Sequence, residues 1–97
     1  MVVKVKIYSI RSKKNKRVCF IGSTIENTLE EELQGKIDYY KAKGKDTKSL
    51  SIIGFGECYI TLLKEIPYSG QINRSKAVYE MKEHIKDNLG AWLDIIN

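Results

Sequence analysis

Apolar and polar residues alternate at the start of the chain. Between residues 3 and 8, every second position is valine or isoleucine, and lysine or tyrosine stands between them. This alternation predicts a half-buried β-strand. A second β-like run extends from about residue 17 to residue 21, and the intervening residues 12–16 are polar and turn-prone. We therefore predict an antiparallel hairpin on which Tyr8 and Phe20 face the same side.

The next pattern has the spacing of an amphipathic helix. Thr28 and Glu31 form a capping box, in which the threonine hydroxyl accepts a backbone N–H and the glutamate reaches back to the cap. Behind it, apolar side chains recur at intervals of four, four and three residues, which predicts a helix packed on the sheet. These side chains are Leu29, Leu33, Ile37 and Tyr40. Gly44 is expected to end the helix.

One further strand and two further helices are predicted in the second half of the chain. Residues 58–63 are rich in β-forming side chains and follow a tight turn at residues 54–56, so we expect them to form the central strand, which Pro67 ends. A helix with an inward-facing apolar stripe is predicted from about residue 74 to residue 86, and a short closing helix from 88 to 96. The stripe consists of Ala77, Met81 and Ile85. The result is an α+β fold in β-β-α-β-α-α order, with a small three-stranded antiparallel sheet flanked by helices.

Length and composition restrict the class of protein. The chain has 97 residues, of which 42% are hydrophobic, so we predict one modest core and a single domain over residues 1–97. No apolar run has the form of a signal peptide or the length of a membrane span, so we expect a soluble intracellular protein without a membrane partner. Cys19 and Cys58 lie in β-like runs, which favours reduced, buried thiols over a disulfide. Because His84 is the only histidine, no zinc cluster is expected.

Positive charge gathers in two segments of the chain. The net charge is +5, from 17 Lys and Arg against 12 Asp and Glu, and it permits contact with phosphate backbones. The first segment holds Arg11, Lys13, Lys14, Lys16 and Arg17, and the second holds Lys41, Lys43, Lys45 and Lys48. Two solvated loops are an equally good interpretation of these residues. The segments are candidates for nucleic-acid contact, and DNA or another nucleic acid is the expected partner.

Several segments, in order and spacing, resemble the GIY-YIG nuclease family. In that family one strand ends in Gly-Ile-Tyr, the next ends in Tyr-Ile-Gly before Ser-Thr, a helix carries an arginine before a leucine, and a later helix carries a glutamate. The matching segments here are Ile7-Tyr8, Ile21-Gly22-Ser23-Thr24, Leu29 and Leu33, Tyr40-Lys41, Ser51-Ile52-Ile53, Leu62 to Pro67, and Ile85. The resemblance implies a GIY-YIG-like fold and an origin in a virus or mobile element.

The same resemblance singles out an active site that is mostly substituted. In the family, two tyrosines lie beside the reacting phosphate, the arginine stabilises its charge, and the glutamate holds a divalent metal. The matching positions here are Tyr8, Phe20, Glu32, Lys36 and Met81. Phe20 keeps the packing of a tyrosine but has no hydroxyl for proton transfer. Glu32 would repel a phosphate, by roughly 4 kcal/mol at about 4 Å, and it instead forms an i, i+4 pair with Lys36.

The metal-ligand position has two alternatives. Counting from Ala77 and Ile85 places Met81 there, which makes it an ordinary core residue. A shift by one residue would place Glu80 there, although adjacent helical residues point about 100° apart. The sequence therefore leaves both Glu80 and Met81 open.

Three functions are compatible with these residues. The one we favour is a catalytically degenerate GIY-YIG domain that binds nucleic acid without cleavage and needs no cofactor. The second is a protein-interaction or structural module, for which an acidic helix start beside basic loops is suitable. The third is an active Mg²⁺- or Mn²⁺-dependent DNA endonuclease that uses Tyr8, Glu80 and Lys36. The sequence leaves the oligomeric state open.

Overall fold

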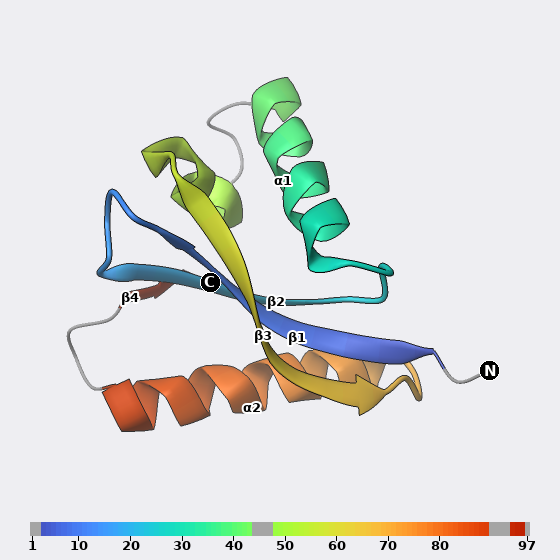
Figure 1. Ribbon diagram of the computed structural model, residues 1–97. Coiled ribbons are helices and arrows are strands. Elements are labelled where there is room, and N and C mark those ends of the chain that lie inside the picture. The colour runs from blue at the N-terminus through green and yellow to red at the C-terminus, as the bar shows by residue number, and fades with distance from the viewer. Residues whose placement is uncertain (1–2, 44–47, 90–93, 97) are drawn as a thin grey trace.

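A computed structural model describes residues 3–43, 48–89 and 94–96, with the backbone alone for residues 48–50 and 89 (Figure 1). The elements are β1 (Lys4–Ser12), β2 (Val18–Thr24), α1 (Leu29–Lys43), the 3₁₀ helix η2 (Lys48–Phe55), β3 (Cys58–Pro67), α2 (Gln71–Leu89) and β4 (Asp94–Ile96). The fold is α+β. No helix within the described ranges combines the length and apolarity needed to cross a membrane.

The strands form a four-stranded mixed sheet in the order β3-β1-β2-β4. β1 pairs antiparallel with β2, where Tyr8 lies opposite Gly22, and antiparallel with β3, where Tyr8 lies opposite Leu62. The prediction that residues 58–63 form the central strand is wrong, because β3 lies at an edge and β1 lies inside the sheet. The burial of β1 gives the physical reason: four consecutive residues from Ile7 to Ile10 are buried, so this strand is covered on both faces.

The predicted three-stranded antiparallel sheet and the closing helix over residues 88–96 are also wrong in detail. α2 continues to Leu89, and Asp94–Ile96 forms β4, which pairs parallel with β2. The N–H of Asp94 donates to the carbonyl of Arg17 at 2.6 Å. Ile95 and Ile96 pack into the two different core clusters, as alternating strand residues do. The predicted helix end at Gly44 lies outside the described residues.

Two layers of helix cover the sheet, with α1 and η2 on one face and α2 on the other (Figure 1). On the α2 face, Val5 and Ile7 belong to the core cluster, and the predicted inward stripe Ala77, Met81 and Ile85 packs against it. On the α1 face, the cluster contains Tyr8, Ile10 and Ile52, and Phe20, Leu29 and Leu33 pack against it. The prediction that Tyr8 and Phe20 face the same side is therefore confirmed.

Both cysteines are free thiols. Cys19 is buried on the α2 face of the sheet, and Cys58 is half-buried at the start of β3. Burial raises the pKa of each thiol above its ordinary value. Neither cysteine therefore has the lowered pKa of a reactive thiolate.

Candidate functional site

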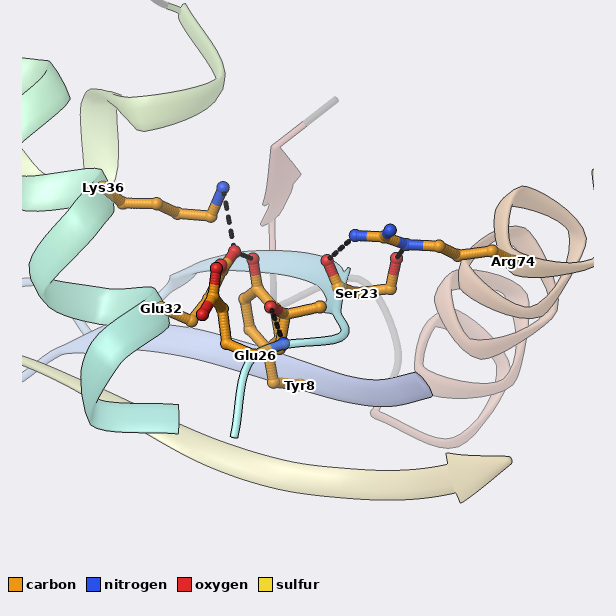
Figure 2. Close-up of polar contacts among 7 residues, drawn as sticks. Tyr8, Ser23, Glu26, Glu32, Lys36 and Arg74 are labelled. Atoms are coloured by element: carbon orange, nitrogen blue, oxygen red, sulfur yellow. Dashed lines mark hydrogen bonds and ion pairs between the residues drawn. The ribbon is translucent and has the colours of Figure 1, made fainter. Parts of the chain in front are cut away.

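Tyr8 lies at the centre of a polar cluster between β1 and the first turns of α1 (Figure 2). Its hydroxyl donates to Oε2 of Glu32 at 2.6 Å, and Nζ of Lys36 lies 3.3 Å from the same oxygen. The Lys36 ammonium also lies 5.3 Å from the centroid of the Phe20 ring. Four of the five positions that the sequence singled out as an active site therefore meet in space. We call Tyr8, Glu32 and Lys36 the tyrosine cluster.

The local sequence explains why the Tyr8 ring fits here. Tyr8 lies opposite Gly22, and a Cβ atom added to this glycine would lie 2.6 Å from the Tyr8 hydroxyl oxygen. The absence of a side chain at position 22 thus leaves the volume that the ring occupies. The Phe20 ring packs beside it, with the centroids 6.3 Å apart and the planes tilted by 36°.

The start of α1 sets the position of Glu32. The Thr28 hydroxyl accepts the backbone N–H of Glu31 at 3.2 Å, as expected of an N-cap, and it lies 3.1 Å from the Glu31 carboxylate. The helix therefore begins at Leu29. Glu32 and Lys36 follow one turn apart on the side that faces Tyr8, so their i, i+4 pairing is the geometry that the spacing predicted.

Burial, together with Glu32, holds the proton on the Tyr8 hydroxyl. The ring is fully buried, and burial is the main cause that raises the pKa of Tyr8 far above its ordinary value; the hydrogen bond and the charge of Glu32 raise it further, while Arg74 lowers it. A phenol that donates to a carboxylate cannot accept a proton from water or substrate. The cluster is therefore arranged as a charge-balanced structural contact, in which Lys36 neutralises Glu32.

We expect the Tyr8 hydroxyl to reduce stability in alkaline solution. In the unfolded chain tyrosine loses its proton near pH 10, whereas the folded protein keeps it to higher pH. The stabilisation from Tyr8 is thus complete below pH 10 and falls as the pH rises further, by up to about 1.4 kcal/mol per pH unit. Urea titrations between pH 8 and pH 11 should show a steeper decline in the parent protein than in Tyr8→Phe, and equal declines would contradict this prediction.

Arg74 is a neighbour of the tyrosine cluster that reasoning from the sequence missed. It stands in the first turn of α2, and its guanidinium donates to the hydroxyl and to the carbonyl of Ser23, at 2.7 Å and 2.8 Å (Figure 2). These bonds tie α2 to the end of β2, beside the tyrosine cluster. The available signal was weak: Arg74 is the only arginine outside the first basic segment.

The two candidates for a metal ligand lie away from the tyrosine cluster. Met81 packs into the core on the opposite face of the sheet. Glu80 is exposed on α2, with its carboxylate 3.9 Å from Nζ of Lys76. In the part of the chain that the structure describes, no three His, Cys, Asp or Glu side chains are grouped as a metal site.

The basic side chains form a second candidate site, which we call the basic face. It consists of the exposed residues Lys13, Lys14, Lys16 and Arg17 on the β1–β2 loop and Lys41 and Lys43 at the end of α1. Lys45 lies outside the described ranges, and Arg11 is half-buried, where its guanidinium donates to the Lys16 carbonyl at 2.5 Å.

Residues 54–57, at the end of η2 and before β3, lie between the two parts of the basic face, and we call them the η2–β3 turn. On one side, the N–H of Lys13 donates to the carbonyl of Glu57 at 3.2 Å. On the other side, the Tyr40 hydroxyl lies so close to Gly54 that a Cβ added there would be 2.6 Å from it. η2 accordingly lies between the hairpin tip and the end of α1 (Figure 1).

Comparison of the chain with protein-family models, with curated proteins and with solved structures gives no significant match in any of the three. The resemblance to GIY-YIG nucleases stays a prediction from the sequence. Inferences about function therefore rest on the contacts and charges of the residues described above.

Proposed function

We propose that the protein is a catalytically inactive GIY-YIG-like domain that binds nucleic acid and does not cleave it. Two arguments support this proposal. The positions of the tyrosine cluster correspond to those of the family's reacting groups, but their chemistry is unsuited to cleavage. The basic face, which lies elsewhere on the surface, is suited to phosphate contact.

The argument against cleavage concerns the groups around Tyr8. A general base must be able to accept a proton, but the Tyr8 hydroxyl donates its proton to Glu32. The neighbouring ring, Phe20, has no hydroxyl. A phosphate approaching this point would meet the Glu32 carboxylate, which has already paired with Lys36. Glu80, the alternative metal ligand, is exposed and directed to Lys76.

The observation that carries the binding proposal is the meeting of two basic segments at one turn. Residues 13–17 and 41–43 are far apart in sequence, yet Lys13 and Tyr40, the residue before the second segment, both adjoin the η2–β3 turn. Clustered, exposed Lys and Arg side chains neutralise phosphates and release their counterions, which is the main source of non-specific affinity for nucleic acid. The face is therefore a better candidate for phosphate contact than isolated surface lysines would be.

Distance separates the basic face from the acidic start of α1. Glu30 and Lys43 lie at opposite ends of the helix, about 20 Å apart along its axis. The Debye length at physiological ionic strength is only about 8 Å. Repulsion from the acidic turn is thus largely screened at the far end of α1, and it does not cancel the attraction at the basic face.

We expect the protein to bind a labelled oligonucleotide with an affinity that falls steeply with salt. Fluorescence anisotropy at several salt concentrations gives the slope of log affinity against log salt. If Lys13, Lys14 and Lys16 each contact a phosphate, changing all three to Gln should reduce the magnitude of this slope for single strands by about 2. A matched variant with Lys64, Lys76 and Lys86 changed to Gln removes the same charge from other exposed sites.

The matched variant decides between local contact and net charge. Equal weakening in the two triple variants would assign binding to net charge and would contradict the basic face, and no binding even at low salt would exclude the function. With Mg²⁺ or Mn²⁺ present, supercoiled plasmid should stay intact. Nicking that disappears in Tyr8→Phe and in Glu80→Ala would instead establish an active endonuclease.

A further inference from the structure

Phe55 is an exposed aromatic side chain in the turn that adjoins both parts of the basic face. It is the last residue of η2, and 42% of its surface is exposed, whereas Ile52 in the same helix is fully buried. One side of η2 therefore packs into the core, and the Phe55 ring at the end of η2 is exposed to solvent. The Phe55 ring is therefore accessible to a ligand at the turn between the two basic segments.

The turn that carries Phe55 is firmly held. The N–H of Gly56 donates to the carbonyl of Ile53 at 3.1 Å, and both Gly56 and Glu57 have positive φ, at 83° and 49°. Glu57 adopts this conformation although it has a side chain, which is uncommon for a residue other than glycine. The buried Ser12 hydroxyl donates to the carbonyl of Gly56 at 2.5 Å. These contacts fix the backbone on the C-terminal side of the ring to the end of β1.

The same contacts bring the backbones of the two basic segments near Phe55, and Glu57 in the same turn is an exposed anion. Consecutive Cα atoms are about 3.8 Å apart, so Phe55 lies within about 8 Å of Glu57, whose carbonyl accepts the Lys13 N–H. On the other side, Gly54 precedes Phe55 and adjoins Tyr40. Lys43 lies three residues after Tyr40, and therefore on the same side of α1.

We infer that the basic face binds single-stranded nucleic acid, with an unpaired base stacked on the Phe55 ring and the adjoining phosphates on the lysines at either side. This inference rests on the proposed function and specifies its ligand. In a duplex the faces of the bases stack on each other, so an exposed ring has no base face to contact. In a single strand the base faces are accessible, and aromatic rings between cationic groups are the usual platform for them.

The chemistry of the ring also determines the specificity. Phenylalanine has no hydrogen-bonding group, and every base has a π-face, so stacking on Phe55 does not distinguish one base from another. The lysines contact phosphates, which are the same at every position. The face should therefore accept single strands of different sequence with similar affinity.

The test compares a labelled single-stranded oligothymidylate with a blunt-ended DNA duplex of two complementary strands, by anisotropy, for the parent protein, Phe55→Ala and Phe55→Trp. We expect the parent to prefer the single strand, and Phe55→Ala to weaken that complex by about 5- to 100-fold while leaving the duplex affinity and the salt slope unchanged. Phe55→Trp should retain the affinity and show fluorescence quenching when the oligonucleotide binds. Tyr79→Ala, which removes an exposed aromatic ring from α2, is the matched control and should have no effect.

The outcomes separate this inference from the proposed function. If Phe55→Ala binds the single strand as tightly as the parent while the variant with Lys13, Lys14 and Lys16 changed to Gln does not, the stacking inference is wrong and the basic face stands. If Phe55→Ala weakens both ligands equally, the ring has no role specific to single strands and the inference is again wrong. If the parent binds neither ligand, the proposed function itself fails. An unchanged melting temperature for Phe55→Ala shows that a loss of affinity does not come from unfolding.

Discussion

Replacing Tyr8 by alanine should lower the free energy of unfolding by about 3–5 kcal/mol. Tyr8 is the largest fully buried side chain in the described residues, and it packs with Ile10 and Ile52 under α1 and η2. Its removal leaves a cavity and takes from Glu32 the hydroxyl that donates to it. Because a domain of this size has a total stability of about 5–15 kcal/mol, the variant should lie close to unfolding. Urea denaturation followed by circular dichroism measures the change.

A second substitution at position 8 separates the contribution of the hydroxyl to stability from that of the ring. Tyr8→Phe keeps the packing and leaves Glu32, whose side chain is only 17% exposed, with Lys36 as its remaining partner; this should lower the free energy of unfolding by about 1–3 kcal/mol. Tyr39→Phe, at an exposed position on α1, is the matched control and should have no measurable effect. If Tyr8→Phe is as stable as the parent at neutral pH, then the hydrogen bond to Glu32 does not stabilise the fold.

Local patterns in the sequence predicted most elements because each has a period that a short window reveals. The alternation over residues 3–8 identified β1, and the capping box at Thr28 identified the start of α1 within one residue. The arrangement of the strands could not be obtained in this way. Residues 58–63 are more β-forming than β1, yet they lie at the edge, since the position in a sheet depends on which strands find partners on both sides.

The last strand shows a further limit of local pattern. Asp94–Ile96 is three residues long, too short for an alternation to be distinguished from helical spacing. Its conformation depends on a tertiary partner, the carbonyl of Arg17, which lies at the other end of the chain. The strand therefore exists because β2 offers an open edge, and no window around residue 95 contains that information.

The two candidate sites differ in how far the sequence could identify them. Glu32 and Lys36 were paired by their spacing, whereas the resemblance named both positions and Tyr8 without predicting the contact between Tyr8 and Glu32. The contacts of Arg74 and Phe55 could not be predicted. Arg74 reaches Ser23 across 51 positions of sequence, and the exposure of the Phe55 ring depends on how η2 packs, although residues 54–56 were recognised as a turn.

Gly22→Ala should lower the free energy of unfolding by about 1–3 kcal/mol, which is a large effect for a single methyl group. The added Cβ would lie 2.6 Å and 2.8 Å from the Tyr8 Oη and Cζ atoms and 2.9 Å from Cε1 of Phe20. Atoms of the protein interior cannot approach so closely, and Tyr8 cannot move away without breaking its bond to Glu32. Overpacking of a closed core is therefore the cause, and urea denaturation measures it.

Gly35→Ala is the matched control for this prediction, because it adds the same methyl group where nothing lies within 4 Å. Gly35 is exposed in the interior of α1, where alanine is favoured over glycine by up to about 1 kcal/mol, so this variant should be more stable than the parent. In the double variant with Gly22→Ala and Tyr8→Phe, the Tyr8 oxygen that lies 2.6 Å from the added Cβ is absent. The double variant should therefore lose less free energy of unfolding than the sum of the losses in the two single variants. Strict additivity, or a Gly22→Ala variant as stable as the parent, would mean that the Tyr8 ring does not fill the space opposite Gly22.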